Sequence, residues 1–286
     1  MDMERQGTFG WLVSLDVFFG GTGAGIFLVS YLLSFFKDYL PIAKIGCLVG
    51  PVLVCIGSVI IFYDLANKVR SYRMIFQLSS WMARGTWSII IFVIFGFAFA
   101  LPQYWISWTE IPVPLMAVGL IAAIAGFIVI LYSGFLFGAV KRVPLWNTSA
   151  LPLLFLFSSL YTGMAVLLLL EVSCQVSSSG VVHNLVIAGF ILTIMQVLAL
   201  AVFLGMALYR NAAAIESVCL LLRNPLFEIL VTVIGVILPL VLFGYQAFTI
   251  TSAVLSIIAC AGVIIGGAYL RYSILKAGVH LPISSL

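Results

Sequence analysis

Long apolar runs follow one another along almost the whole sequence, and short polar segments separate them. Each run reaches the roughly 20 residues that a helix needs to cross about 30 Å of hydrocarbon. The runs are continuous and do not alternate, unlike the strands of a membrane β-barrel. The pattern predicts an all-α integral membrane protein without a soluble domain. We expect eight transmembrane helices, at Gly10–Phe36, Pro41–Tyr63, Gly85–Tyr104, Val113–Val140, Ser149–Leu170, His183–Tyr209, Pro225–Tyr245 and Thr249–Tyr272.

The composition supports this interpretation. Hydrophobic residues make up 64% of the sequence and charged residues only 8%, whereas roughly a quarter of a soluble domain is charged. The first apolar run is long and lacks a cleavage signal, so we expect it to be a retained helix and not a signal peptide. The five cysteines are scattered without metal-ligand spacing, and we expect them to be packing residues.

The basic residues predict an orientation. With eight spans, eleven of the 13 Lys and Arg residues fall on the side of the N-terminus, and only Lys37 and Lys44 fall on the other. Under the positive-inside rule both termini are predicted to be cytoplasmic. Residues 210–224 have charged ends and an apolar middle, so we expect a short helix in the membrane interface there.

A weak internal repeat appears at an offset near 140 residues. Thr22-Gly23 recurs as Thr162-Gly163, and Tyr132-Ser133 recurs as Tyr272-Ser273. Four helices return the polypeptide to its starting side of the membrane, so a duplication gives parallel repeats. The repeat predicts two parallel four-helix bundles, at residues 1–145 and 146–286.

Four polar side chains are predicted to converge near the basic face. Asp16 lies about one and a half turns inside the first helix, Asp64 closes the second, Arg84 opens the third, and Tyr132 lies near the end of the fourth. A charge inside a bilayer is expensive. Asp16 is therefore either a structural carboxylate paired with a cation such as Arg84, or a group that exchanges protons or binds a ligand. Tyr132 is either part of this site or a tyrosine of the interfacial belt.

Residues around this cluster have similar alternatives. Gly20 and Gly23 follow Asp16 on its own helix face. Trp146 is either an interfacial belt residue or a neighbour of the site, and Asn147 either caps the fifth helix or contacts a ligand.

A second polar set extends toward the opposite surface. Gln196 and Tyr161 lie near the middle of their helices, and Glu171 lies at the far end of the fifth. These three residues could form a proton path across the bilayer, or they could bond the helices to one another.

The sequence lacks the residues that several kinds of cofactor site or catalytic site would need. The only histidines, His183 and His280, lie at a helix start and in the tail, so no facing pair can bind haem. The sequence shows no metal cluster, phosphate loop or nucleophile triad, and we expect the protein to be non-catalytic alone. We interpret the basic face as a determinant of topology and not as a nucleic-acid surface.

Three stretches carry a resemblance to a known family: "LDVFFGGTGAGIFLVS", "SSWMARGTW" and "YSGFLFGAVKRVPLWNTSALPLLFLFSSLYTG". Together they resemble the NrfD/PsrC family of membrane subunits, over about the first 170 residues and by helix count beyond them. In the loop after the second helix, "DLANKVRSYR" departs from the family's D-L-x-R-P pattern, since it lacks the proline.

The resemblance implies a function. It implies a membrane anchor of a prokaryotic respiratory oxidoreductase that binds menaquinone or ubiquinone, itself carrying no haem or iron-sulfur cluster. It implies a ferredoxin-like four-cluster iron-sulfur partner and a molybdopterin catalytic subunit, and a quinone site that uses Asp16 and Tyr132. Two rival functions remain: a proton-translocating coupling subunit of such a complex, and a secondary transporter, which would need helices broken at the midplane.

Overall fold

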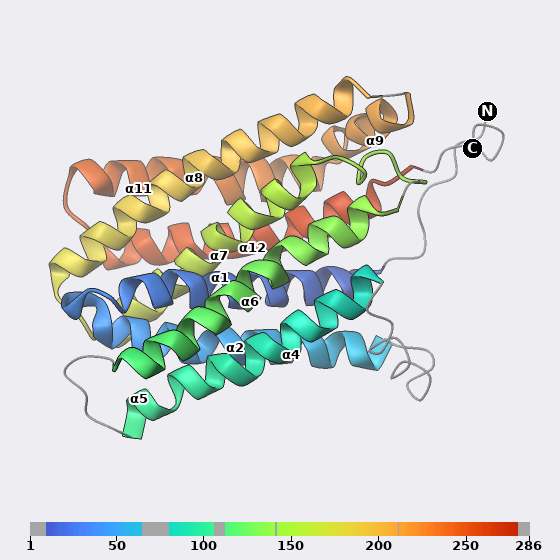
Figure 1. Cartoon of the computed structure of the whole chain (residues 1–286). Helices are drawn as coiled ribbons and strands as arrows, with labels where there is room; N and C mark the ends of the chain where they lie inside the picture. The colour runs from blue at the N-terminus through green and yellow to red at the C-terminus, as the bar shows by residue number, and fades with distance from the viewer. Residues whose placement is uncertain (1–9, 65–79, 106–111, 141, 211, 280–286) are drawn as a thin grey trace.

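The computed structural model describes residues 10–64, 80–105, 112–140, 142–210 and 212–279. These residues include eight helices that are long and apolar enough to cross a membrane (Figure 1). The prediction of an all-α integral membrane protein with eight spans is confirmed. The spans are α1 (Trp11–Leu33), α2 (Leu40–Asp64), α4 (Trp81–Ala100) with α5 (Pro102–Trp105), α6 (Val113–Gly138), α7 (Ala150–Cys174), α8 (Ser179–Leu208), the joined segments α10 (Pro225–Phe227), η2 (Glu228–Ile237) and α11 (Leu238–Phe248), and α12 (Ala253–Lys276).

Two short helices connect the spans. The 3₁₀ helix η1 (Lys37–Tyr39) joins α1 to α2, and α9 (Ala212–Leu222) lies between α8 and α10. Helix α9 falls within the segment predicted to form a short helix. Figure 1 shows it at the end of the bundle where α1 begins and α12 ends.

Helix α1 is central, since it packs against α2, α6, α7 and α12. Its closest approach is to α7, where a Cβ atom added at Gly25 would overlap the backbone oxygen of Ser159. One turn away, the hydroxyls of Thr22 and Thr162 form a hydrogen bond of 3.0 Å. Only small residues allow two membrane helices to approach this closely.

The two halves of the sequence have the same order of neighbours. Helices α1, α2, α4 and α6 pack consecutively, and α6 returns to α1. Helices α7, α8, α11 and α12 do the same, and α12 returns to α7. This order is what a duplication would produce, while the division into bundles at residues 1–145 and 146–286 stays a prediction.

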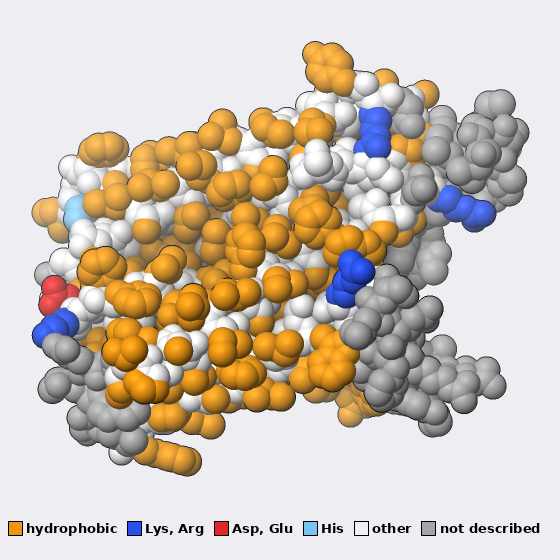
Figure 2. Space-filling model, viewed as in Figure 1, with side chains coloured by type: hydrophobic (Ala, Val, Ile, Leu, Met, Phe, Trp, Pro, Cys, Tyr) orange, Lys and Arg blue, Asp and Glu red, His pale blue; other side chains and the backbone are white. Residues whose placement is uncertain are grey.

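The outer surface suits contact with lipid. Figure 2 shows hydrophobic side chains along the length of the viewed face, with basic side chains gathered toward the end that carries α9. Large apolar side chains such as Leu198, Val202 and Val241 are more than half exposed on the helix surfaces. A soluble protein rarely exposes contiguous apolar surface on this scale.

The seventh span changes its helix type partway. Residues Glu228–Ile237 form a π-helix, in which each N–H bonds the carbonyl five residues earlier, and an α-helix follows. In an α-helix the carbonyl of Gly235 would bond the N–H of residue 239, but Pro239 has none. The Tyr161 hydroxyl donates to this carbonyl instead, at 3.1 Å. The apolar pattern of this span gives no sign of the π-helix.

Candidate functional site

The structure brings Asp16 and Tyr132 to the same end of the bundle. Asp16 lies on α1 with its carboxylate toward α2, so that a Cβ atom added at Gly57 would lie 3.3 Å from Oδ1. Tyr132 lies near the end of α6, and its ring packs flat on Gly85 of α4, where any larger residue would displace it. Helix α2, which Asp16 faces, packs against α4, which the Tyr132 ring contacts. Both side chains remain partly accessible.

Arg84 lies in the first turn of α4, next in sequence to Gly85, which contacts the Tyr132 ring. Its exposed guanidinium lies 5.2 Å from the ring centroid of Trp81, a cation–π distance. The Trp81 ring in turn stacks on Phe135 of α6 at 5.3 Å. Helix α4 begins at Trp81, earlier than predicted, so Arg84 belongs to the helix and not to the segment before it. Asp64 is the last residue of α2, and its side chain lies outside the described part.

The two glycines predicted beside Asp16 differ in their surroundings. Gly20 has open space where a side chain would be. Gly23 packs against α2, because an added Cβ would lie 2.5 Å from the Gly50 backbone oxygen. Gly23 therefore serves helix packing, while Gly20 leaves room on the Asp16 face.

Trp146 is not an interfacial belt residue, and that interpretation is wrong. Its side chain is completely buried, and its indole Nε1–H donates to the Ile274 backbone oxygen at 2.9 Å. The ring also packs edge-on against Phe137 at 5.5 Å. Trp146 thus joins the segment after α6 to the end of α12. Its indole N–H is satisfied by a protein carbonyl and needs no water.

Asn147 lies at a cavity of about 300 Å³. The cavity is formed by the start of α4, the end of α6 and the segment before α7, and Trp81, Gly134 and Phe135 also line it. The Asn147 Oδ1 accepts a hydrogen bond from Arg210 at 2.8 Å. The N-cap of α7 is Ser149, so Asn147 does not occupy the capping position.

The three residues of the predicted proton path do not form one continuous series of bonds among the described residues. Tyr161 and Gln196 line the same small cavity of about 10 Å³, and Gln196 Oε1 is buried without a partner in the described part of the protein. Glu171 is wholly buried at the other end of α7, where its carboxylate accepts from Ser177 N at 2.8 Å and Ser177 Oγ at 3.2 Å. Glu171 fixes the turn between α7 and α8.

Arg271 is the residue that sequence reasoning missed. The charge count treated it as a flanking cation, but its side chain is completely buried between α1, α7 and α12. Its guanidinium donates to Gly267 O at 3.1 Å and to Ser159 Oγ at 2.9 Å, and lies 5.4 Å from the Phe18 ring centroid. Its Nε has no hydrogen-bond partner within the described ranges.

The described residues offer no group of three His, Cys, Asp or Glu side chains that could hold a metal ion. The candidate site comprises the Asp16 carboxylate and the Tyr132 phenol near one end of an apolar bundle, with the Arg84 guanidinium at the same end of α4. This arrangement can donate hydrogen bonds and exchange protons with an uncharged, lipid-soluble molecule.

The fold and the site define the class of protein: a membrane protein with eight spans and polar side chains near one end. The family model described as "Polysulphide reductase, NrfD" matches residues 1–282, and the protein belongs to this family.

Two curated relatives are similar to this protein. The C chain of polysulfide reductase from Wolinella succinogenes is 26% identical over 206 residues, which cover 61% of the present sequence and 63% of that relative. The match thus spans less than two thirds of the length of this relative. Protein NrfD of Escherichia coli K12 is 27% identical over an alignment of 305 positions, gaps included, and the alignment covers 94% of each protein.

The burial of Trp146 yields a test of the packing at this end. Replacing Trp146→Phe should lower the free energy of unfolding by about 1–3 kcal/mol, because the substitution leaves a void and removes the bond to Ile274. Trp105→Phe is the matched control, since Trp105 is 85% exposed and should tolerate the change. Denaturant titration of both variants in detergent measures the difference. Equal stability of the two variants would contradict the buried position of Trp146.

Proposed function

We propose that the protein is the membrane anchor and quinone-binding subunit of a multisubunit respiratory oxidoreductase. It exchanges electrons between the quinone pool, menaquinone or ubiquinone, and an iron-sulfur partner subunit. Membership of the NrfD family supports a membrane subunit. The observation that carries the proposal is the placement of Asp16 and Tyr132 at one end of the bundle, where Asp16 faces α2 and Tyr132 contacts the adjacent helix α4.

A quinone site needs polar groups for the carbonyl oxygens and an apolar route for the isoprenoid tail. A groove of about 420 Å³ between α2 and α4 supplies such a route. Its lining is almost entirely apolar and includes Val59 and Ile89. These residues lie close in sequence to Gly57 and Gly85, the glycines that Asp16 and Tyr132 contact. We assign the groove to the tail and the polar pair to the head group.

The polar residues then have distinct roles. Tyr132 donates a hydrogen bond from its phenol to one carbonyl oxygen, and Asp16 takes up or releases the proton that accompanies electron transfer. Arg84 supplies positive charge at the same end of α4. Gly20 keeps the Asp16 face of α1 open, because no atom lies within 4 Å of the position a side chain would take.

The distribution of charge supports an orientation and a docking face. With the topology predicted from the sequence, most Lys and Arg residues fall on the side of the membrane that carries this site, so we assign both termini to the cytoplasm of a prokaryotic cell and the protein to its cytoplasmic membrane. A ferredoxin-like subunit with four clusters would dock close to the quinone site and pass electrons to or from a molybdopterin subunit. The name of the Wolinella relative describes it as one of the chains of a polysulfide reductase, so that relative is part of a larger enzyme.

The role of Asp16 is tested by Asp16→Asn in the assembled complex. Quinol oxidation should fall at least about a hundredfold, because the amide cannot exchange the proton, while assembly on native gels should not change. Asp38→Asn is the control, since Asp38 is exposed in η1 at the opposite end of the bundle. Full turnover by Asp16→Asn would show that Asp16 is structural and would overturn the proposal.

The tail groove is tested by Val59→Trp, which fills it from a side chain that is 53% exposed. The ratio kcat/KM for a long-tailed quinol should fall about tenfold, whereas a quinol without the tail should react as before, because only the tail needs the groove. Ile191→Trp on the lipid-facing side of α8 is the matched control. Equal losses for both quinols would assign the groove to something other than the tail.

A second candidate function is proton translocation. Ser158 and Gln196 line one small cavity beside α12, and Ser158 Oγ and Gln196 Oε1 are buried without a partner in the described part of the protein. Arg271 Nε, nearby on α12, is another such atom. Buried polar atoms of this kind usually bond internal water, and water can relay protons. No such observation favours a secondary transporter: the seventh span changes helix type partway, but it stays helical from Pro225 to Phe248.

Proton translocation is tested with the complex in sealed liposomes. A proton-translocating complex should change the lumen pH during turnover, and Gln196→Leu should remove most of this change while electron transfer continues. A protonophore provides the control for a transmembrane gradient. A lumen pH that follows only the protons of the quinone reaction, identical in wild type and Gln196→Leu, would make the protein a plain anchor.

A further inference from the structure

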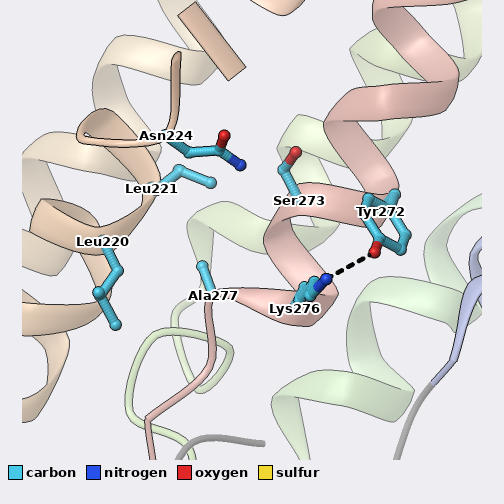
Figure 3. Close-up of a pocket in the computed structure, with 7 residues that line it drawn as sticks. All are labelled: Leu220, Leu221, Asn224, Tyr272, Ser273, Lys276 and Ala277. Carbon is cyan, nitrogen blue, oxygen red and sulfur yellow. Dashed lines mark hydrogen bonds between the residues drawn. The ribbon is translucent and has the colours of Figure 1, made fainter. Parts of the chain in front are cut away.

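A second pocket opens at the basic end of the bundle, away from Asp16 and Tyr132. It has a volume of about 390 Å³ and lies between α9 and the last turns of α12 (Figure 3). In Figure 3 the leucines lie on the α9 side, and the tyrosine, serine and lysine lie on the α12 side. These residues belong neither to the proposed quinone site nor to the group of buried atoms around Ser158, Gln196 and Arg271. The lining consists of Leu220, Leu221, Asn224, Tyr272, Ser273, Lys276 and Ala277.

The polar groups of this pocket can donate hydrogen bonds to a ligand. The Lys276 ammonium gives one hydrogen to the Tyr272 hydroxyl at 2.9 Å, which leaves it two further hydrogens. Because the Tyr272 oxygen accepts this bond, its own hydrogen is free to point into the pocket. Asn224 Oδ1 accepts a hydrogen bond from Leu226 N at 3.1 Å, and one amide hydrogen of Asn224 donates to the Tyr269 hydroxyl at 3.3 Å, which leaves the second amide hydrogen for a ligand.

Ser273 provides an independent sign of a ligand. Its side chain is only 4% exposed, and its hydroxyl has no hydrogen-bond partner among the described residues. Burial of an unbonded hydroxyl costs about 1–3 kcal/mol, so such groups are normally satisfied by a ligand or by water. Figure 3 shows this hydroxyl on the side of α12 that faces Asn224.

The charge of the lining favours an anion. One cation and three neutral donors surround the pocket, and no acidic side chain is among the described residues that line it. Phosphate oxygens accept hydrogen bonds only, and charge-assisted bonds from an ammonium are among the strongest in proteins. The leucines of α9 add an apolar wall, which free phosphate would not need and a fatty acyl group would.

The internal repeat explains why a pocket exists here. An offset of 140 residues joins Thr22 to Thr162 by a direct hydrogen bond. The same offset relates Tyr272 to Tyr132, and it relates the asparagine of the pocket to the arginine of the proposed quinone site. The pocket therefore occupies, in the second half of the sequence, the position that the proposed quinone site occupies in the first.

Residues that differ at equivalent positions of the two halves give the pocket a different chemistry from the proposed quinone site. The position of Asp16 is occupied by Leu156 in the second half, so the carboxylate that would exchange protons is lost. The position of Leu136 is occupied by Lys276, which adds a cation. A site without a proton acceptor and with a fixed positive charge suits an anionic ligand better than a neutral quinone.

We propose that this pocket binds the phosphate head group of an anionic membrane phospholipid. Lys276, Tyr272 and Ser273 donate hydrogen bonds to the phosphate together with the Asn224 amide, and the two leucines of α9 contact the start of a fatty acyl group. The bound lipid joins α9 to α12 and holds the short helix at the membrane surface, where basic residues attract anionic lipids.

The experiment uses the full-length protein in its complex, purified in detergent and stripped of lipid. Native mass spectrometry and thermal unfolding are measured with dioleoyl phosphatidylglycerol, with the zwitterionic dioleoyl phosphatidylcholine and with inorganic phosphate. Phosphatidylglycerol should bind at least about tenfold more tightly than phosphatidylcholine and raise the melting temperature by several degrees.

Variants then locate the site. Lys276→Gln and Ser273→Ala should each weaken phosphatidylglycerol binding about tenfold and leave quinol turnover unchanged. Arg223→Gln is the matched control, because Arg223 is exposed at the same end of the molecule without lining the pocket.

Three results would overturn the proposal. Equal weakening by Arg223→Gln would indicate general attraction to the basic surface. Competition by millimolar inorganic phosphate that fully displaces the lipid would make the ligand free phosphate. Displacement of phosphatidylglycerol by a quinone analogue, lost in Lys276→Gln, would make the pocket a second quinone site.

Discussion

The close crossing of α1 and α7 is the constraint on which the rest of the structure depends. Lipid gives little hydrophobic drive for helices to associate, so their contact must come from backbone approach and interhelical hydrogen bonds. Gly25 and Gly163 allow the approach, since an added Cβ at either would overlap the facing backbone. The Thr22–Thr162 hydrogen bond fixes the register between the two helices. Because α1 also contacts α2, α6 and α12, this register sets where its polar residues point.

The register gives α1 two chemically different faces. Asp16 points toward Gly57 on α2, on the side of the proposed quinone site. Gly21, on another face, leaves room for the Arg271 guanidinium, since an added Cβ would lie 3.0 Å from one of its nitrogens. A carboxylate and a guanidinium thus lie on or against the same helix without forming an ion pair among the described contacts. The arginine instead bonds groups of α7 and α12, and its charge stays available to polarise the polar atoms around it.

Much of the fold could be predicted from sequence because the bilayer restricts it. An apolar run of about 20 residues has essentially one structure in hydrocarbon, which is why the eight spans were predictable. The rotation of each helix about its axis could not be predicted in the same way, because hydropathy is nearly uniform around these helices. Arg271 lies five residues before Lys276, and both look like flanking charges, yet one is buried and the other exposed. The sequence left two alternatives for Trp146 for the same reason, because a tryptophan near a helix end looks alike whether it faces lipid or protein.

The two halves of the sequence differ in backbone and side chains although they show a repeat. Span α4 is α-helical throughout, whereas its counterpart in the second half includes the π-helix η2, so the halves differ in backbone as well as in side chains. In the first half Gly85 lets the Tyr132 ring lie against α4. In the second half Pro225 stands at the position of that glycine, and the Tyr272 hydroxyl bonds Lys276 beside an open pocket. Under the proposed duplication, the half with the Asp16 carboxylate serves electron and proton exchange. The other half has Leu156 at the position of Asp16 and a cation, Lys276, at the position of Leu136, as the proposed anionic ligand requires.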